Sequence, residues 1–220
     1  MKIDNRDVKV ETFPKEYYSF ELYNSRVRML TYWHQISEIL KTNSKTVLEI
    51  GIGSGLVTNY LRYLGLDVKT ADINANLNPD FHASILDFND NIGKYDLVVC
   101  CRVLHHIEFD KLGIALDRIS SRTNRYAIIT LPVDEARIYF MGRITASPLH
   151  TFSFTVPHFI KRQYSKMSRK AIGSGLWQIN SSKDTSLERT RLKISEYFNI
   201  VRGYQLPEDK SHYMFVLEKI

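Results

Sequence analysis

The feature that most constrains this fold is a group of three glycines in Gly51-Ile-Gly-Ser-Gly55, directly after the β-rich run Thr46–Ile50. The run predicts a short strand, and the apolar spacing that resumes at Leu56 predicts a helix that ends at Gly65. Glycines at a strand-to-helix turn adopt dihedral angles that other residues resist, and they let the backbone approach a ligand closely. The turn therefore predicts a ligand site, with a glycine-rich turn that binds nothing as the alternative.

Two common nucleotide-binding motifs do not match this turn. No Lys-Ser or Lys-Thr pair follows the glycines, which excludes a P-loop. The dinucleotide fingerprint has its third glycine one position later, where this chain has Leu56. The ligand is therefore expected to be neither a P-loop nucleotide nor a standard dinucleotide.

Strand and helix signals alternate along the rest of the chain. Apolar residues at helical spacing predict a helix over Arg26–Lys41, with a buried face of Val27, Leu30, Trp33, Ile36 and Leu40 and a cap at Asn24 or Ser25. Another stripe comprises Leu112, Ala115, Leu116 and Ile119, and Thr185-Ser-Leu-Glu188 is interpreted as a capping box. Further strands are expected at Asp67–Asp72, His82–Leu86, Tyr95–Cys101, Tyr126–Leu131, Ile200–Tyr204 and Tyr213–Glu218.

This alternation predicts the fold class. Continuously apolar strands between helices favour a parallel sheet that is covered on both faces. The connection between the last two strands is too short for a crossover helix, so that pair should be antiparallel. We expect a Rossmann-like α/β fold whose seven-stranded sheet is mostly parallel and has an antiparallel last strand.

Composition and charge exclude some functional classes. The chain has 44% hydrophobic and 25% charged residues, as is usual for soluble globular proteins. No apolar run approaches the ~18 residues that a membrane span needs, and the N-terminal residues do not resemble a secretory signal, so a cytoplasmic location is expected. The adjacent Cys100 and Cys101 would point to opposite faces of a strand, so reduced thiols are expected. No set of His, Cys, Asp and Glu at ligand spacing predicts a metal site.

A net charge of +6 admits nucleic acid, an anionic membrane surface or a phosphorylated substrate, and selects none of them. Part of this charge is concentrated in one stretch, which comprises Lys161, Arg162, Lys166, Arg169 and Lys170. The stretch could bind phosphate, although a solvated helix face is the commoner explanation of such a run.

Two carboxylates follow predicted strands beyond the glycine turn. Asp72 closes the second strand about twenty residues after the turn, where this type of fold places an acid that binds ribose hydroxyls. A carboxylate suits that task because it can accept hydrogen bonds from both hydroxyls. Asp87 closes the predicted third strand and could accept a hydrogen bond from an adenine amine, or it could cap the segment that follows.

In order and spacing, the segment Leu48–Gly55, Asp72, Asp87 and the segment Tyr95–Ile107 resemble the motifs of the class I S-adenosylmethionine-dependent methyltransferases. The resemblance covers roughly residues 44–132 and implies S-adenosylmethionine as the cofactor. It implies that the methionine part faces Glu49 and the turn glycines Gly51, Gly53 and Gly55, with the backbone around Cys101 beside its amino group. It further implies that Asp72 holds the ribose, Ile73 packs on the adenine and Asp87 meets the adenine amine.

The flanking segments are similar to small bacterial methyltransferases of polysaccharide-biosynthesis clusters, which often carry a His-Trp-Glu triplet where this chain has Leu176-Trp177-Gln178. This closer resemblance implies a small-molecule or glycan acceptor, and the basic stretch suggests that it is anionic. Trp177 and Arg102 are the candidate substrate-binding residues, with a place in the core as the alternative for Trp177. We expect a single domain that consists of a helical lid (1–43), a cofactor-binding core (44–132), a cap insertion (133–190) and C-terminal strands (191–220).

His105 and His106 are the candidate catalytic residues. They follow the fourth strand, at the edge of the sheet where such folds bind substrate. His106 matches the second residue of the family's usual Glu-His pair, and an imidazole suits removal of a hydroxyl proton. Alternatively, one or both histidines start the next helix and form hydrogen bonds with its backbone. We expect methyl transfer to an oxygen or nitrogen nucleophile. The rivals are a nucleic-acid methyltransferase, disfavoured because no RNA-binding module is recognisable, and a non-catalytic binding protein.

Overall fold

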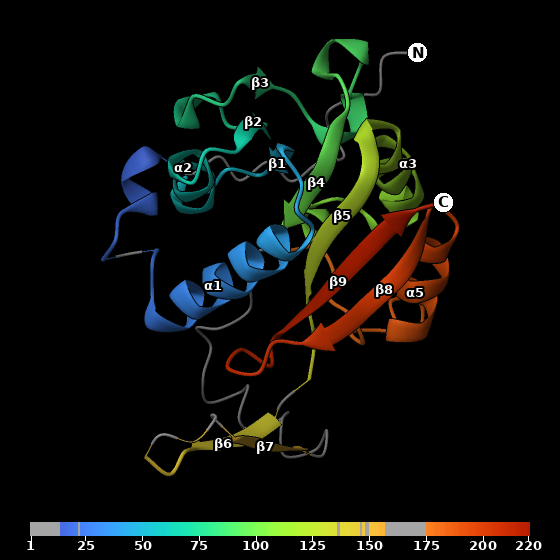
Figure 1. The fold of residues 1–220 in the computed structure, drawn as a ribbon. Helices are drawn as coiled ribbons and strands as arrows, with labels where there is room; N and C mark the ends of the chain where they lie inside the picture. The colour runs from blue at the N-terminus through green and yellow to red at the C-terminus, as the bar shows by residue number, and fades with distance from the viewer. Residues whose placement is uncertain (1–13, 22, 136, 146, 148–149, 157–174) are drawn as a thin grey trace.

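The structure, a computed structural model, describes residues 14–21, 23–135, 137–145, 147, 150–156 and 175–220. Its main sheet has seven strands (Figure 1). Their order is β3 (Phe81–His82), β2 (Asp67–Asp72), β1 (Thr46–Ile50), β4 (Tyr95–Cys101), β5 (Thr123–Pro132), β9 (His212–Lys219) and β8 (Phe198–Gln205). Strand β9 is antiparallel to β5 and to β8, whereas the pairings among β1 to β5 are parallel. The predicted Rossmann-like fold with an antiparallel last strand is confirmed.

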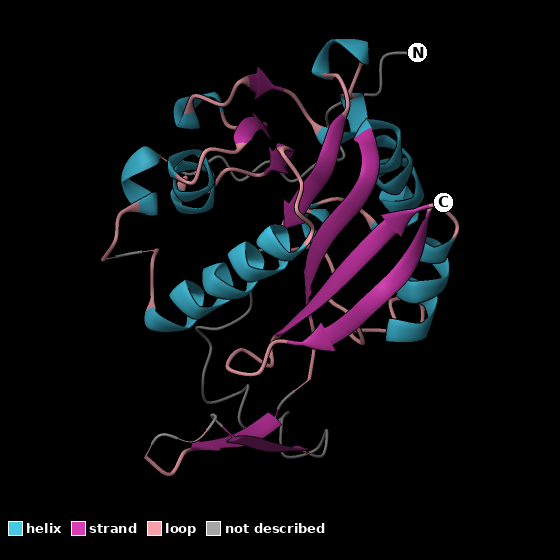
Figure 2. Ribbon diagram, viewed as in Figure 1, coloured by secondary structure: helices cyan, strands magenta, loops and turns pink. Residues whose placement is uncertain are grey.

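Helices cover both faces of this sheet (Figure 2). Side chains that alternate along the strands form two cores: Val47, Leu97 and Val99 pack with α1 (Arg26–Lys41) and α2 (Leu56–Tyr63). Leu48, Val98 and Cys100 pack on the other face with α3 (Leu112–Arg122) and α5 (Leu187–Ser195). Because neighbouring strand residues point to opposite faces, a continuously apolar run is what a sheet covered on both faces requires.

The third strand departs from its prediction. Only Phe81–His82 pairs with β2, and Ile85–Asp87 forms the 3₁₀ helix η4. The Ser84 side chain accepts a hydrogen bond from the amide of Leu86 and so caps this turn at 3.3 Å. The prediction of a strand over His82–Leu86 is wrong because one helical turn buries Ile85 and Leu86 as well as a strand would, and a short apolar run does not distinguish the two.

Helix α1 has the predicted bounds, and Ser25 caps it by accepting a hydrogen bond from the Arg28 amide at 3.3 Å. Its predicted buried face is wrong, because Val27, Trp33 and Leu40 are exposed. The side chains that are buried instead are Thr31, Gln35, Glu38 and Ile39.

Polar partners explain this orientation of α1. The Glu38 carboxylate accepts hydrogen bonds from Arg202 and, at 3.2 Å, from the hydroxyl of Tyr204 on β8. The Thr31 hydroxyl donates to the backbone oxygen of Val27 at 3.2 Å. Buried polar groups with partners carry little penalty, so the helix can turn its polar side inward.

The segment between β5 and α5 lies in the predicted cap insertion. It contains the hairpin β6 (Arg137–Gly142) and β7 (His150–Thr155), which lies apart from the main sheet at the bottom of Figure 1. Helix α5 is capped by Ser186, which accepts from the Arg189 amide at 3.3 Å. The predicted capping box is therefore wrong by one residue, because Thr185 accepts from the Ser182 amide in the preceding turn. The basic stretch from Lys161 to Lys170 lies outside the described residues.

Membrane insertion has no candidate helix here: within the described ranges, none is both long and apolar enough to cross a bilayer.

Candidate active site

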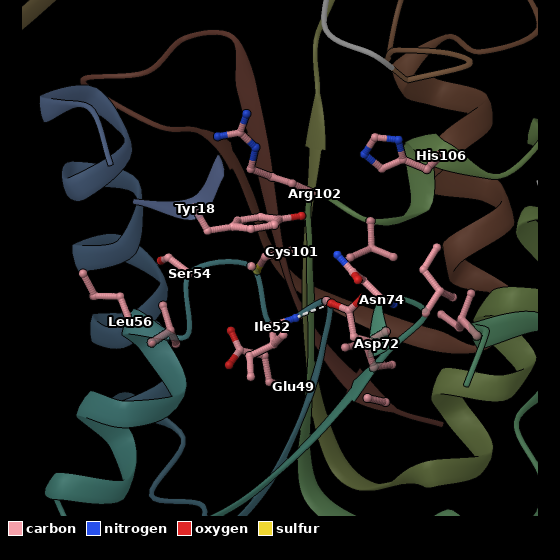
Figure 3. Close-up of a pocket in the computed structure, with 18 of the residues that line it drawn as sticks. Tyr18, Glu49, Ile52, Ser54, Leu56, Asp72, Asn74, Cys101, Arg102 and His106 are labelled. Carbon is pink, nitrogen blue, oxygen red and sulfur yellow. Dashed lines mark hydrogen bonds between the residues drawn. The ribbon is translucent and has the colours of Figure 1, made fainter. Parts of the chain in front are cut away.

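A cavity of 470 Å³ lies at the carboxyl ends of β1, β2 and β4 (Figure 3). The chain runs outward from β1 to β2 and β3, then returns to β4 on the other side of β1. Ligands of open parallel sheets bind at such a reversal, outside the carboxyl ends of the strands. The topology alone therefore makes this cavity the candidate active site.

The glycine turn forms one wall of the cavity. Gly51, Gly53 and Gly55 all have positive φ angles, of 85°, 53° and 72°. A Cβ atom on Gly51 would lie 2.3 Å from the Cγ2 atom of Val103, so this position requires glycine for space as well as for its dihedral angles. Gly51 and Gly53 line the cavity, whereas Gly55 is not among the lining residues and instead begins α2 as its N-cap.

Asp72 fixes the shape of this wall. One oxygen of its carboxylate accepts a hydrogen bond from the Ile52 amide at 2.9 Å, and the other accepts from the Asn74 amide at 2.8 Å (Figure 3). Burial raises the pKa of Asp72 in spite of these bonds. Asp72 and Ile73 both line the cavity, so the structure brings them to the glycine turn, as the sequence predicts.

Asp87 does not reach the cavity. The cavity is lined by Ser84 and Ile85 of the same segment, but Asp87 is exposed at the end of η4 and is not among the lining residues. The sequence prediction placed Asp87 at the end of a strand, where it would have pointed to the carboxyl edge. The short β3 and the turn that follows it remove that constraint.

Glu49 is a buried acid in the floor of the cavity. It lies on β1, lines the cavity and accepts a hydrogen bond from the Thr58 hydroxyl of α2. Burial raises its pKa to about 7, because a carboxylate loses its hydration there. Near neutral pH its charge therefore responds to any cation that binds beside it.

The two cysteines are free and differ in position. Cys100 is buried under α3, and Cys101 lines the cavity. Burial raises the pKa of the Cys101 thiol to about 12. The thiol is therefore protonated at neutral pH and is not an activated nucleophile.

The two candidate catalytic histidines lie on the 3₁₀ helix η6 (Leu104–His106) and both line the cavity. Their ring centroids are 4.0 Å apart. His105 is buried, its Nδ1 atom has no hydrogen-bond partner among the described residues, and burial together with its cationic neighbours lowers its pKa to about 2. An imidazole that stays neutral is a poor proton acceptor, so His106 is the better candidate base.

Trp177 packs next to this histidine turn. It is 6% exposed, its indole N–H donates to the backbone oxygen of Ile107 at 2.9 Å, and its ring meets Phe109 edge-on. Next to it, Gly175 lies so close to His105 that a Cβ atom there would be 2.1 Å from the imidazole. The structure thus places Trp177 in the core and not among the cavity residues, in contrast to its predicted role in substrate binding.

Several cavity residues were not predicted as site residues by the sequence analysis. Tyr18, on the 3₁₀ helix η2 (Lys15–Tyr18), extends across the cavity in Figure 3, and its hydroxyl bonds to the side chain of Asn74. Burial raises the pKa of Tyr18 to about 12. Tyr23, Arg28 and Tyr32 complete this side. They belong to the predicted lid, and Arg28 and Tyr32 lie in a flanking segment that carries the closer resemblance.

The cavity fits a nucleoside that carries an amino acid. Asp72 supplies an acceptor for hydroxyl groups, Ile73 and Ile85 supply apolar surface, and the glycine turn supplies closely approaching backbone amides. A metal is not needed for this fit: across the described residues, no group of three or more His, Cys, Asp and Glu is placed to hold one.

Comparisons with known proteins agree with this geometry. A protein-family profile described as "Methyltransferase domain" matches residues 23–169, which is more than half of the chain. No curated protein matches the chain.

Solved structures share the fold at low sequence identity. An N-methyltransferase, NodS from Bradyrhizobium japonicum, in complex with S-adenosylhomocysteine, has a TM-score of 0.58 at 12% identity, over 91% of each chain. A magnesium protoporphyrin IX methyltransferase, ChlM from Synechocystis, with bound S-adenosylmethionine, has a TM-score of 0.57 at 14% identity, over 88% of this chain and 80% of the other. An S-adenosylmethionine-dependent methyltransferase from Clostridium acetobutylicum has a TM-score of 0.57 at 13% identity, over 90% and 96%.

Proposed function

This chain belongs to the methyltransferase domain family, and we propose that it transfers a methyl group from S-adenosylmethionine to an oxygen or nitrogen atom of a small-molecule or glycan acceptor. One observation carries the proposal. The glycine turn and Asp72, which lie about twenty residues apart in sequence, meet at the switch point of the sheet and are joined by the hydrogen bond from Ile52 to Asp72. Two structures of the same fold were solved with S-adenosylmethionine or S-adenosylhomocysteine, which supports this choice of cofactor.

The cavity residues divide into roles for the cofactor. Asp72 would bind the ribose hydroxyls, because its carboxylate lines the cavity and has lone pairs beyond those used by the two amides. Ile73 would pack against the adenine. Glu49, the turn at Gly51 and Gly53, and the backbone at Cys101 would surround the methionine part. We leave Asp87 out because it is exposed outside the cavity.

The cofactor supplies an already activated methyl group on its sulfonium, so the protein mainly has to align the acceptor with it. Alignment of two reactants can lower a barrier by about 7–11 kcal/mol. The glycine turn and Asp72 would fix one reactant, and the β4 exit with η6 would orient the other. His106 would take the proton of the acceptor, which is worth about 10²- to 10⁴-fold in rate.

The finer predictions of the sequence analysis remain predictions. The glycan acceptor and the polysaccharide-cluster relatives rest on the resemblance of the flanking segments. A nucleic-acid acceptor would rest on the basic stretch at 161–170, which lies outside the described residues, so no structural observation favours it.

A transfer assay tests the proposal. Methyl-labelled S-adenosylmethionine is incubated with the protein and a panel of sugar nucleotides and lipid-linked glycans, and labelled product is expected from at least one of them. His106→Ala should then lower kcat about 10²- to 10⁴-fold and leave the Kd for S-adenosylhomocysteine unchanged. His34→Ala is the matched control, because this imidazole bonds to Glu208 and does not line the cavity. Full turnover by His106→Ala would show that His106 is not the general base. The absence of label from every product would count against these acceptors.

A further inference from the structure

We propose that Arg102 and Arg28 form an anion-binding subsite in this cavity, and that Arg102 uses it to anchor a phosphate or carboxylate group of the methyl acceptor. The inference rests on the proposed function, because it assigns a chemical class to the acceptor of that reaction. It is carried by the placement of the two arginines and by the lack, among the described residues, of a carboxylate at ion-pair distance from either of them.

Arg102 is placed at the cavity by an unusual backbone conformation. It is the first residue after β4, and its φ of 62° lies in the left-handed region that residues other than glycine seldom adopt. Its amide still donates to the Thr130 oxygen at 3.0 Å, so the sheet pairing holds the residue there. In Figure 3 its side chain extends over the ring of Tyr18. Such outliers persist where the surrounding structure fixes them, and they gather at binding sites.

Neither arginine has a counter-charge at ion-pair distance within the part of the chain that the structure describes. The Arg28 guanidinium lies 3.7 Å from the ring centroid of Tyr23, and its buried Nε atom has no hydrogen-bond partner among the described residues. Asp209, the acid on this side of the cavity, is engaged by His212 at 2.6 Å and by Ser211. The charge of Asp209 still acts on Arg102, but one carboxylate faces two cations. This excess of positive charge favours an anionic ligand, since buried charges require partners.

The charge itself is secure at neutral pH. Burial and the nearby charge of Arg28 lower the pKa of Arg102 below its usual value. A guanidinium nevertheless keeps its proton in proteins, and its fork of N–H donors matches the oxygens of a phosphate or carboxylate.

The two arginines line the same cavity, and they lie near enough for the charge of Arg28 to lower the pKa of Arg102. Arg28 stacks on Tyr23, whose hydroxyl would be 3.5 Å from a Cβ atom on Gly53, and the neighbouring Tyr32 hydroxyl is 3.3 Å from the Ser54 hydroxyl. Arg28 is therefore the cation nearest the glycine turn, where the amino-acid end of the cofactor is proposed. Arg102 lies on the β4 side with His106, where the acceptor is proposed. This division gives the acceptor anion to Arg102, with Arg28 adding to the positive potential.

The experiment titrates inorganic phosphate into the protein, both alone and saturated with S-adenosylhomocysteine, and follows Tm and calorimetric Kd against potassium chloride at equal ionic strength. Saturable stabilisation by phosphate is expected in the wild type. Arg102→Asn should weaken phosphate binding at least 10-fold and change the Kd for S-adenosylhomocysteine less than twofold. Asparagine is chosen because it tolerates a positive φ, so the variant should fold. Arg102→Lys keeps the charge but lacks the fork of N–H donors. Its affinity for phosphate should lie between those of the wild type and Arg102→Asn.

Arg125→Gln is the matched control, because it removes an exposed cation at the start of β5, whose nearest acid is Glu218 at 3.6 Å. It should bind phosphate as the wild type does. Phosphate effects no larger than those of chloride, or equal in the wild type and Arg102→Asn, would overturn the subsite. A 10-fold loss of S-adenosylhomocysteine affinity in Arg102→Asn, with none for 5′-methylthioadenosine, would assign Arg102 to the cofactor carboxylate and overturn the acceptor role. Should S-adenosylhomocysteine itself not bind, the proposed function fails, and the phosphate titration of the protein alone still decides the subsite.

Discussion

The two sides of the cavity are built in different ways. The side proposed for the cofactor comes from the ends of β1 and β2, and its shape is set by backbone: positive φ angles at the glycines and amides that donate to Asp72. The side proposed for the acceptor comes from Tyr18 on η2 and from Arg102 and His106 after β4, which lie on segments far apart in sequence. The comparison indicates that the first side is encoded locally, whereas the second depends on how distant segments pack.

The largest effect is expected from Gly51→Ala on the cofactor side. Gly51 and Gly65 share a φ of 85°, but a Cβ atom would meet Val103 at 2.3 Å at Gly51 and nothing within 4 Å at Gly65. Both alanine variants bear left-handed strain of about 1–2 kcal/mol, and Gly51→Ala adds overpacking of about 1–3 kcal/mol. Urea unfolding of both variants measures the loss of stability from left-handed strain, and the difference between them measures the cost of overpacking. We expect Gly51→Ala also to lower affinity for S-adenosylhomocysteine at least ~100-fold, by distorting the turn, and Gly65→Ala to retain it.

The next effect concerns the two aspartates that the sequence analysis treated alike. Asp72→Asn replaces an acceptor whose charge strengthens two backbone hydrogen bonds, so affinity for S-adenosylhomocysteine should fall about 10- to 100-fold, the equivalent of about 1.5–3 kcal/mol. Asp87→Asn changes an exposed side chain outside the cavity and should alter the Kd less than twofold. Calorimetry on both variants measures these affinities. Equal losses of affinity would indicate that Asp87 also contacts the cofactor.

The two sides also differ in the sign of their response to pH. His105 keeps a pKa of about 2 in the folded protein, so between pH 6.5 and 5 the unfolded chain gains a proton that the folded chain does not. Stability from this group therefore falls as pH falls. Glu49, with a pKa raised to about 7, acts oppositely: its contribution falls as pH rises from 4.5 to 7.

Comparing the pH dependence of stability of each variant with that of the wild type separates the contributions of His105 and Glu49. Urea unfolding at pH 5 and 6.5 should show that His105→Gln loses about 1–2 kcal/mol less than the wild type on acidification. Glu49→Gln should show a difference of the opposite sign. Identical pH slopes in the wild type and His105→Gln would mean that His105 is protonated in the folded state.

The smallest effect is expected at an exposed residue of α1. Trp33 is 63% exposed, so Trp33→Ala should change the free energy of unfolding by less than about 0.5 kcal/mol. Ile39 on the same helix is fully buried, and Ile39→Ala should cost about 2–5 kcal/mol. A large loss of stability in Trp33→Ala would indicate that Trp33 is buried, as the apolar spacing predicts.

These contrasts show which parts of the molecule can be predicted from sequence. The bounds of β1, β2 and β4 and the antiparallel last pair were predicted because strand period and connection length are local properties. The placement of Asp72 at the cavity follows from strand order. The buried face of α1 was not predictable, because Glu38 is satisfied by Arg202 and Tyr204, far away in sequence.

The acceptor side also contains features that could not be predicted, because they depend on contacts between residues far apart in sequence. Trp177 was expected near substrate, but its indole bonds to Ile107 and packs under the histidine turn, a contact across 70 residues of sequence. Tyr18, and Arg28 beside the glycine turn, were not predicted as site residues, since a tyrosine or arginine near the N-terminus is assigned to the cavity only by the packing of α1 and η2.

The most direct test of the central claim is calorimetric titration of the wild type with S-adenosylhomocysteine, with Gly51→Ala and Gly65→Ala in parallel. The account predicts saturable binding at one site in the wild type and in Gly65→Ala, and its loss in Gly51→Ala. Absence of binding in the wild type, or equal binding in all three proteins, would contradict it.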